Sequence, residues 1–145
     1  MGVAVSGTVS RKLGARPGAR SIFVGAPETA LDAIDPPQLD LASDLTGEFD
    51  YIHVFATTRS ELEESLPELT SHLKPTGMLW VSWPKSRKLE TDLVLAKVIS
   101  IGYSHGLVES KCVSVDATWS ALKFTLPKPG KTYSNSYGQL PPSSH

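Results

Sequence analysis

The sequence has little cysteine, no long apolar run and no excess of charge of either sign. Its one cysteine, Cys112, excludes an internal disulfide and a cysteine-rich metal cage. No stretch approaches the roughly 18 consecutive apolar residues that a membrane-spanning helix needs, and residues 1–10 lack the basic start and apolar segment of a signal peptide. We therefore expect a cytoplasmic protein without disulfides.

Charge is balanced in total but unevenly distributed along the chain. The 14 Lys and Arg residues and 15 Asp and Glu residues give a net charge of -1, which argues against a general nucleic-acid binder that relies on an overall positive field. Residues 1–27 are basic and free of acids, residues 28–73 are strongly acidic, and residues 74–145 are basic again. A solvated surface explains this segregation, and a surface that faces a partner is the alternative.

Strand and helix patterns alternate along the chain, which is the order typical of an α/β fold. Short apolar runs predict buried strands at 21–24, 51–56 and 78–83, and a weak alternation predicts an edge strand at 39–45. Two more predicted strands, at 107–115 and 119–126, have the spacing of an antiparallel hairpin. Right-handed crossovers then predict a shortened, three-layer Rossmann-like sandwich with a mainly parallel sheet and a C-terminal antiparallel hairpin.

Each predicted helix has a recognisable start. Pro27 suits the first position of one helix, Ser60 and Glu63 fit a capping box for the next, and Thr91 suits the cap of the last. Pro67 predicts a kink or a break in the second helix. Composition divides the chain into a flexible N-terminus at 1–10, a single α/β domain at 11–126, and a Pro- and Ser-rich tail at 127–145 that we expect to be disordered.

The loops that follow the parallel strands carry the candidate binding residues, because ligands of open α/β sheets bind beyond the carboxyl ends of the strands. The loop at 83–88 combines an aromatic residue and a proline with three cations, which suits a phosphate or carboxylate with a ring attached. A solvated basic loop with its tryptophan in the core is the plainer interpretation. The candidate ligand-binding residues are Thr57, Arg59, Trp83, Lys85, Arg87 and Lys88.

Other familiar chemistry is missing from the sequence. The turn after the first strand, at 25–28, has one glycine where a dinucleotide site has G-x-G-x-x-G, and no P-loop motif occurs. The histidines lack metal-ligand spacing, and His53 with Asp50 has no nucleophile placed beside it by an elbow motif. We therefore expect no metal, no catalytic residue and no cofactor.

Several motifs nevertheless resemble a known enzyme fold. Arg16-Pro17-Gly18 before a strand that ends in Gly25, followed by a strand opening at 48–51 and another after 73–77, is similar to a shortened class I S-adenosylmethionine-dependent methyltransferase domain. The resemblance implies that Gly25 and Ala26 would hold an adenosyl ligand, with Asp40 as the acid for its ribose hydroxyls. Asp50 follows the first strand by only about 25 residues, whereas a full methyltransferase domain fits two more strands there.

A second resemblance covers about residues 11–126. The run GMLWVSWPK at 77–85, Gly106-Leu107-Val108 and the VDATWS segment at 115–120 are similar to a small bacterial family known only as a domain of unknown function. This resemblance implies a fold rather than an activity.

These observations leave three hypotheses open. The leading one is a non-catalytic Rossmann-like binding or regulatory domain that recognises an anionic ligand or a protein partner. The alternative is a minimal S-adenosylmethionine-dependent methyltransferase or adenosyl-ligand binder. A second alternative is a nucleic-acid-associated accessory protein, which would need Arg11, Lys12, Arg16 and Arg20 to share a face with the basic loop at 85–88.

Overall fold

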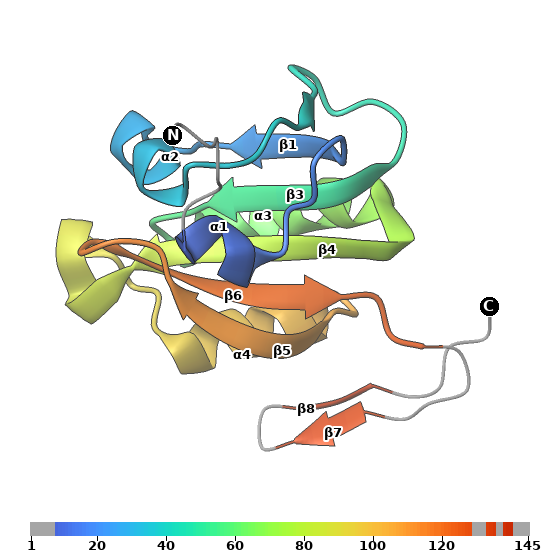
Figure 1. Cartoon of the computed structure of the whole chain (residues 1–145). Helices are drawn as coiled ribbons and strands as arrows, with labels where there is room; N and C mark the ends of the chain where they lie inside the picture. The colour runs from blue at the N-terminus through green and yellow to red at the C-terminus, as the bar shows by residue number, and fades with distance from the viewer. Residues whose placement is uncertain (1–7, 129–132, 136–137, 141–145) are drawn as a thin grey trace.

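The computed structural model describes residues 8–128, 133–135 and 138–140, and a mixed sheet runs through its centre (Figure 1). The six strands of this sheet lie in the order β2-β1-β3-β4-β6-β5. Their bounds are β1 (Arg20–Val24), β2 (Asp40–Leu41), β3 (Phe49–Phe55), β4 (Leu73–Pro84), β5 (Val108–Ser114) and β6 (Trp119–Thr125). Strands β2, β1, β3 and β4 are parallel, whereas β6 is antiparallel to both β4 and β5. The predicted α/β fold with its antiparallel terminal hairpin is confirmed.

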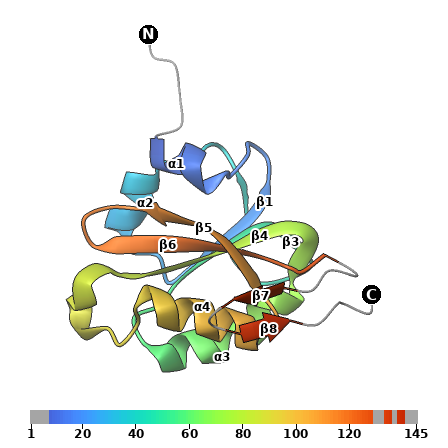
Figure 2. The same cartoon turned by 90° about the horizontal axis from the view of Figure 1, so that it is seen from below.

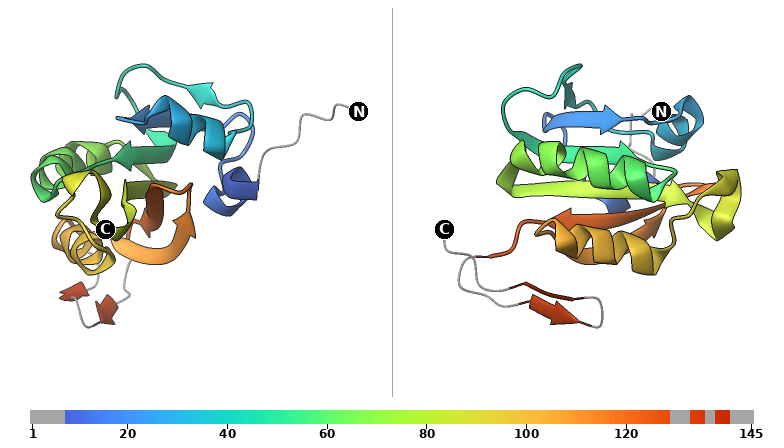
Figure 3. Two further views of the ribbon diagram at one scale, coloured as in Figure 1. Left: turned by 90° about the vertical axis from the view of Figure 1, so that its left-hand side faces the viewer. Right: turned by 180° about the vertical axis from the view of Figure 1, so that it is seen from behind.

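Helices cover both faces of the sheet (Figures 2 and 3). Helices α1 (Thr8–Leu13) and α2 (Glu28–Ile34) pack on one face, and α3 (Arg59–Ser71) and α4 (Leu95–Ser104) pack on the other. Ile52 and Val54 of β3 point toward α3 and α4, while Tyr51 and Phe55 point toward α1 and α2. Because both faces are covered, β3 reads as a continuous apolar run in the sequence.

Helix α3 begins two residues earlier than the sequence analysis predicts. Thr58 is its N-cap: the Thr58 hydroxyl accepts the Glu61 amide N–H, and the Glu61 carboxylate accepts the Thr58 amide N–H. The predicted capping box at Ser60 and Glu63 is therefore wrong. Pro67 lies inside the helix without dividing it. Its missing N–H would have paired with the carbonyl of Glu63, which is exposed, so water can satisfy that carbonyl.

Helix α4 also begins differently from the prediction. Its N-cap is Val94, which makes no side-chain capping bond. Thr91 instead uses its hydroxyl to donate to the Thr57 carbonyl and to accept the Leu93 amide N–H. A segment of tight turns, η1 (Lys85–Glu90), separates β4 from this stretch, and Ser86, Arg87, Leu89 and Glu90 have a positive φ there.

The predicted edge strand at 39–45 is much shorter in the structure. Only Asp40 and Leu41 pair with β1, and they pair with its first two residues. The Arg20 guanidinium then donates to the Thr46 carbonyl, which holds the following chain near the start of β3. The chain therefore returns to begin β3 without extending β2.

Both ends of the chain contain structure that the sequence analysis did not predict. Helix α1 begins at Thr8, inside the segment expected to be flexible. Strands β7 (Tyr133–Asn135) and β8 (Gly138–Leu140) pair as a hairpin inside the tail expected to be disordered, and β8 packs near α4. The rest of those two predicted segments, at 1–7, 129–132, 136–137 and 141–145, lies outside the described residues. Among the described residues, no helix has the length and apolar content to cross a membrane.

Candidate functional site

The carboxyl ends of the parallel strands and the β5–β6 turn meet along one side of the sheet, which we call the carboxyl edge. Strands β1, β3 and β4 are parallel and end there, and β5 also ends there because it is antiparallel to β6. The Lys85 amide N–H donates to the Thr118 carbonyl at 2.7 Å, which joins the loop after β4 to the β5–β6 turn. The carboxyl edge is where ligands of open α/β sheets bind.

The turn after β1 brings backbone rather than side chain to the carboxyl edge. Gly25 is exposed and has a φ of +70°, and a Cβ atom added to it would lie 3.1 Å from the carbonyl oxygen of Phe55. The turn therefore requires glycine, both for its left-handed backbone and for its close approach to β3. Ala26 follows and is partly buried.

Thr57 and Arg59 lie in the turn after β3, where their backbone groups serve the fold. The Thr57 carbonyl accepts the Thr91 hydroxyl, and the Arg59 amide N–H donates to Asp92 Oδ1 at 2.8 Å. Both bonds tie the β3 turn to the segment that precedes α4. Neither residue is among those that line the neighbouring cavity.

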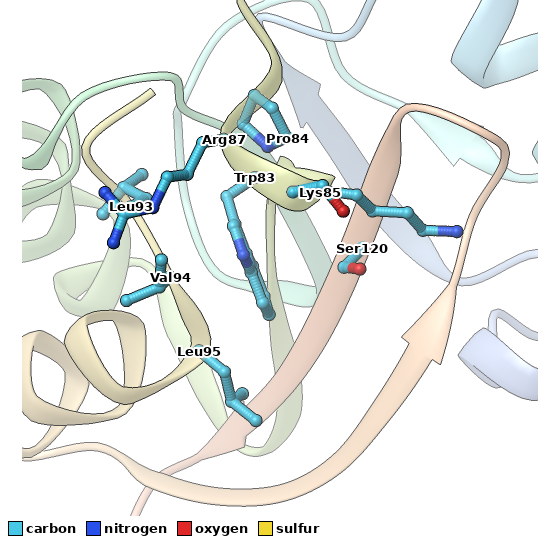
Figure 4. Close-up of a pocket in the computed structure, with 9 residues that line it drawn as sticks. Trp83, Pro84, Lys85, Arg87, Leu93, Val94, Leu95 and Ser120 are labelled. Atoms are coloured by element: carbon cyan, nitrogen blue, oxygen red, sulfur yellow. The ribbon is translucent and has the colours of Figure 1, made fainter. Parts of the chain in front are cut away.

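A cavity of about 490 Å³ opens beside the end of β4 (Figure 4). Its volume lies within the range of small-molecule sites. The indole of Trp83 lies at its centre and is 5% exposed, and Leu93, Val94 and Leu95 form its apolar wall. The full lining consists of Trp83, Pro84, Lys85, Ser86, Arg87, Leu93, Val94, Leu95 and Ser120.

Two of the three cations predicted from the basic loop border this cavity. In Figure 4, the Arg87 side chain extends toward Leu93, and the Lys85 side chain extends the opposite way, past Ser120. The Lys85 ammonium donates to the Ser114 hydroxyl. Lys88 is not part of the lining, because its ammonium donates to the Ala117 carbonyl at 2.8 Å. The structure thus brings Trp83, Lys85 and Arg87 together and leaves out Lys88.

Asp40 lies beside the start of β1, whereas Gly25 follows the end of that strand. Asp40 pairs in register with Arg20 at the start of β1, and its carboxylate lies 3.9 Å from the Arg20 guanidinium. Gly25 is five residues further along, which is roughly 16 Å at about 3.3 Å per residue. The three residues that the sequence analysis assigned to an adenosyl ligand, Gly25, Ala26 and Asp40, therefore do not form one site.

A second cavity, of about 470 Å³, lies at the amino ends of the strands. The loop at 14–19 forms one wall, and Asp50, Tyr51, Thr76 and Met78 form the rest. The Asp50 carboxylate contacts the Lys74 ammonium at 3.1 Å and accepts the Arg20 amide N–H at 3.0 Å. The bond to Lys74 holds the pKa of Asp50 below its usual value. Asp50 therefore anchors the start of β3 and does not orient His53.

Sequence reasoning missed a buried hydrogen-bonded chain at the centre of the sheet. His53 Nδ1 lies 2.8 Å from the Tyr51 hydroxyl, and its Nε2 lies 2.6 Å from the Ser82 hydroxyl. Burial lowers the pKa of His53 to about 3 and raises the pKa of Tyr51. All three side chains are buried, so the Tyr51–His53–Ser82 hydrogen bonds have a structural role. The two-residue spacing of Tyr51 and His53 was the available signal, since it places both on one face of β3.

Metal ligands do not gather anywhere in the described part of the chain: no group of three His, Cys, Asp or Glu residues is arranged to hold an ion.

Solved structures with a similar fold include methyltransferases. The ribosomal protein L11 methylase from Lactobacillus delbrueckii subsp. bulgaricus matches with a TM-score of 0.57 and 14% identity, over 83% of this chain and 75% of that chain. The precorrin-6y C5,15-methyltransferase from Geobacter metallireducens matches with a TM-score of 0.55 and 12% identity, over 82% and 86%. The magnesium protoporphyrin IX methyltransferase from Synechocystis, solved with bound S-adenosylhomocysteine, matches with a TM-score of 0.52 and 13% identity, over 77% and 75%.

No match in sequence accompanies this likeness in structure. No family model matches the chain, and no curated protein matches it. The resemblance to the bacterial family of unknown function is therefore not confirmed, whereas the distant resemblance to the methyltransferase fold is confirmed. At 14% identity or less, these neighbours establish the fold alone.

The expectation that the protein uses no cofactor is corrected by the same likeness. The fold that the chain adopts is one whose solved examples include a methyltransferase with bound S-adenosylhomocysteine and the same enzyme with bound S-adenosylmethionine. The single glycine of the turn after β1 is a local departure within a fold that is otherwise similar to that of methyltransferases.

Proposed function

We propose that this chain binds S-adenosylmethionine at the carboxyl edge of β1 and β3 and acts as a small methyltransferase. The observation that carries the proposal is the Gly25 turn, an exposed left-handed glycine at the end of a parallel strand in a sheet of the methyltransferase type. A turn without a side chain lets a ligand approach the backbone closely.

We assign the residues at this edge to two parts of S-adenosylmethionine, its amino-acid part and its ribose hydroxyls. Gly25 and Ala26 would border the amino-acid part of the ligand. We leave Asp40 out of the proposed site, because it lies on β2 opposite the start of β1. Glu28 is exposed in the first turn of α2, three residues after Gly25. We assign the ribose hydroxyls to the Glu28 carboxylate, since carboxylates accept hydrogen bonds from hydroxyls.

When bound, S-adenosylmethionine supplies an electrophilic methyl group. The chain itself would position an acceptor in the cavity beside Trp83, whose apolar wall excludes water from one side. No Asp, Glu or His lines that cavity. The chain therefore orients the acceptor and does not remove a proton from it, which favours acceptors that are nucleophilic without a base.

Calorimetric titration with S-adenosylmethionine and S-adenosylhomocysteine tests this proposal. We expect the wild-type protein to bind both, and Gly25→Val to lose at least tenfold in affinity, because its side chain would fill the turn. Glu28→Gln should also weaken binding. Absence of binding to the wild-type protein at millimolar ligand would overturn the proposal.

Gly18→Val controls for left-handed backbone strain, and thermal unfolding of both variants controls for the contact between a Cβ at position 25 and the Phe55 carbonyl oxygen. Gly18 is also exposed with a φ of +80°, so the substitution carries a similar backbone cost, but it lies at the opposite end of the sheet with nothing within 4 Å of its added Cβ. We expect Gly18→Val to bind within twofold of the wild type. Equal losses in the two variants would mean that backbone strain, and not ligand contact, causes the effect.

A further inference from the structure

We propose that the cavity beside Trp83 binds a small organic anion with an apolar body, and that Arg87 holds its anionic group. This inference names the substrate class of the proposed methyltransferase and rests on that function only for the identification of the anion as the acceptor. The binding itself is a property of the cavity and is measured without S-adenosylmethionine.

The apolar part of the ligand is inferred from the cavity wall. Trp83 and Leu93 are buried beneath the cavity, and Leu95 is 43% exposed at its mouth. Leu95 is one of only three large hydrophobic side chains exposed among the described residues. An exposed leucine next to a buried indole at one concave site indicates a surface that an apolar ligand would cover.

The charge of the ligand is inferred from Arg87. No described residue forms a hydrogen bond or an ion pair with the guanidinium of Arg87. The Lys85 side chain extends away from Arg87, and its ammonium donates to Ser114, so Lys85 borders the cavity without reaching the same anionic group. No carboxylate among the lining residues neutralises either cation. A guanidinium without a partner suits a carboxylate or a phosphate, which it can bind through two hydrogen bonds.

The start of helix α4 adds positive potential on the same side. Val94 and Leu95 line the cavity, and the first turn of this ten-residue helix has no acidic residue and no side-chain cap. The unpaired amide groups of a helix start carry partial positive charge. The guanidinium of Arg87 extends toward this end of the cavity in Figure 4. The anionic group is therefore placed between Arg87 and the start of α4, with the apolar body toward Trp83.

Titration calorimetry with three naphthalene probes tests the inference in the absence of S-adenosylmethionine. The probes are 2-naphthoate, 2-naphthyl phosphate and the neutral 2-naphthalenemethanol, which share one apolar body. We expect at least one anionic probe to bind tenfold or more tightly than the alcohol, and the ranking of the two anions then distinguishes a carboxylate from a phosphate ligand. Equal affinity for all three probes, or no binding, overturns the inference.

Two variants separate the charge from the fold. Arg87→Gln should lose at least tenfold in affinity for the preferred anion while its affinity for the alcohol stays within twofold of the wild type. Arg16→Gln is the control, because Arg16 is an exposed arginine at the amino ends of the strands, outside the lining, and its loss changes the net charge equally. Equal effects of the two variants would overturn the assignment to Arg87.

A second measurement distinguishes failure of this inference from failure of the proposed function. Affinity for S-adenosylmethionine is measured on the wild type and on Arg87→Gln, and we expect it to be equal in both. A protein that binds the cofactor but none of the anionic probes retains the proposed function and overturns this inference. Binding of an anionic probe without binding of S-adenosylmethionine overturns the proposed function, and the inference of an anion site then still holds.

Discussion

His53 is a buried ionisable side chain whose environment opposes its charged form. Its ring stacks on Phe55 at 4.6 Å and is surrounded by Phe23 and Trp80, and its two nitrogens are used by the Tyr51 and Ser82 hydroxyls. A charged imidazolium would lose hydration at this position without gaining an anionic partner. The folded state therefore holds His53 neutral, which makes folding sensitive to acid.

We predict that stability falls as the pH is lowered from neutral. The pKa of His53 is about 3 in the folded state, below its ordinary value of 6.5. The stabilisation from neutral His53 is thus fully present above pH 6.5 and is lost as the pH falls toward 3. The expected slope is about 1.4 kcal/mol for each pH unit below 6.5. Urea unfolding at pH 7.5 and pH 5.0 measures it.

His53→Gln is the control for this pH dependence. Glutamine offers one acceptor and donors to the same two hydroxyls but does not titrate. The variant should be less stable than the wild type at pH 7.5, and its stability should change much less between pH 7.5 and pH 5.0. A wild type and a variant that lose stability in parallel would show that another group is responsible.

At the scale of elements, the contact between α4 and β6 depends on one glycine. A Cβ atom added to Gly102 would lie 2.1 Å from Cε1 of Phe124, a ring with no exposed surface. We predict that Gly102→Ala destabilises the protein by about 1–3 kcal/mol through overpacking, although alanine favours helix by about 1 kcal/mol over glycine. Thermal or urea unfolding measures the difference.

Ser100→Ala tests the intrinsic helix effect separately. Ser100 is exposed on the same helix, so its replacement changes propensity without changing packing. We expect this variant to be as stable as the wild type or slightly more so. Stabilisation by Gly102→Ala would mean that α4 moves away from β6 at little cost.

The elements were predictable from the sequence where a pattern is local. The apolar runs at 21–24, 51–56 and 78–83 became the cores of β1, β3 and β4. The cap of α3 was not decidable in this way, because Thr58 with Glu61 and Ser60 with Glu63 both fit a capping box. Only packing against the β3 turn selects between them.

The candidate site was likewise predictable only where its residues lie near one another in the sequence. Trp83, Lys85 and Arg87 are consecutive enough to be found together in the sequence. Ser120 and the segment at 93–95 join them only through the β4–β6 pairing and the path of the chain into α4. The length of β2 depends on the bond between Arg20 and the Thr46 carbonyl, which no spacing rule anticipates.

At the scale of the whole molecule, two cations face each other on the β5–β6 edge of the sheet. Lys111 and Lys123 lie directly opposite each other on β5 and β6, and the Lys111 ammonium donates to the Lys12 carbonyl at 2.9 Å. Arg20 lies at the other side of the sheet with Asp40.

We predict that Lys123→Glu stabilises the protein by about 0.2–1 kcal/mol at low salt, because it replaces a pair of like charges on neighbouring strands by an attractive pair. The gain should shrink in 0.5 M NaCl as the charges are screened. Urea unfolding at both salt concentrations measures it. Arg16→Glu, in the exposed loop before β1, changes the net charge equally and should give a smaller gain; an equal gain would point to net charge alone.

The short β2 strand also makes the chain open to enlargement. Beyond Ser21, β1 has no β2 residue in register on its outer side, and the connection at 42–48 runs along the surface with mostly exposed residues. A segment inserted between Ser43 and Asp44 would add to the rim of the sheet without crossing its core. In evolutionary and engineering terms, this connection is the point at which a small domain can acquire further strands while it keeps the fold it already has.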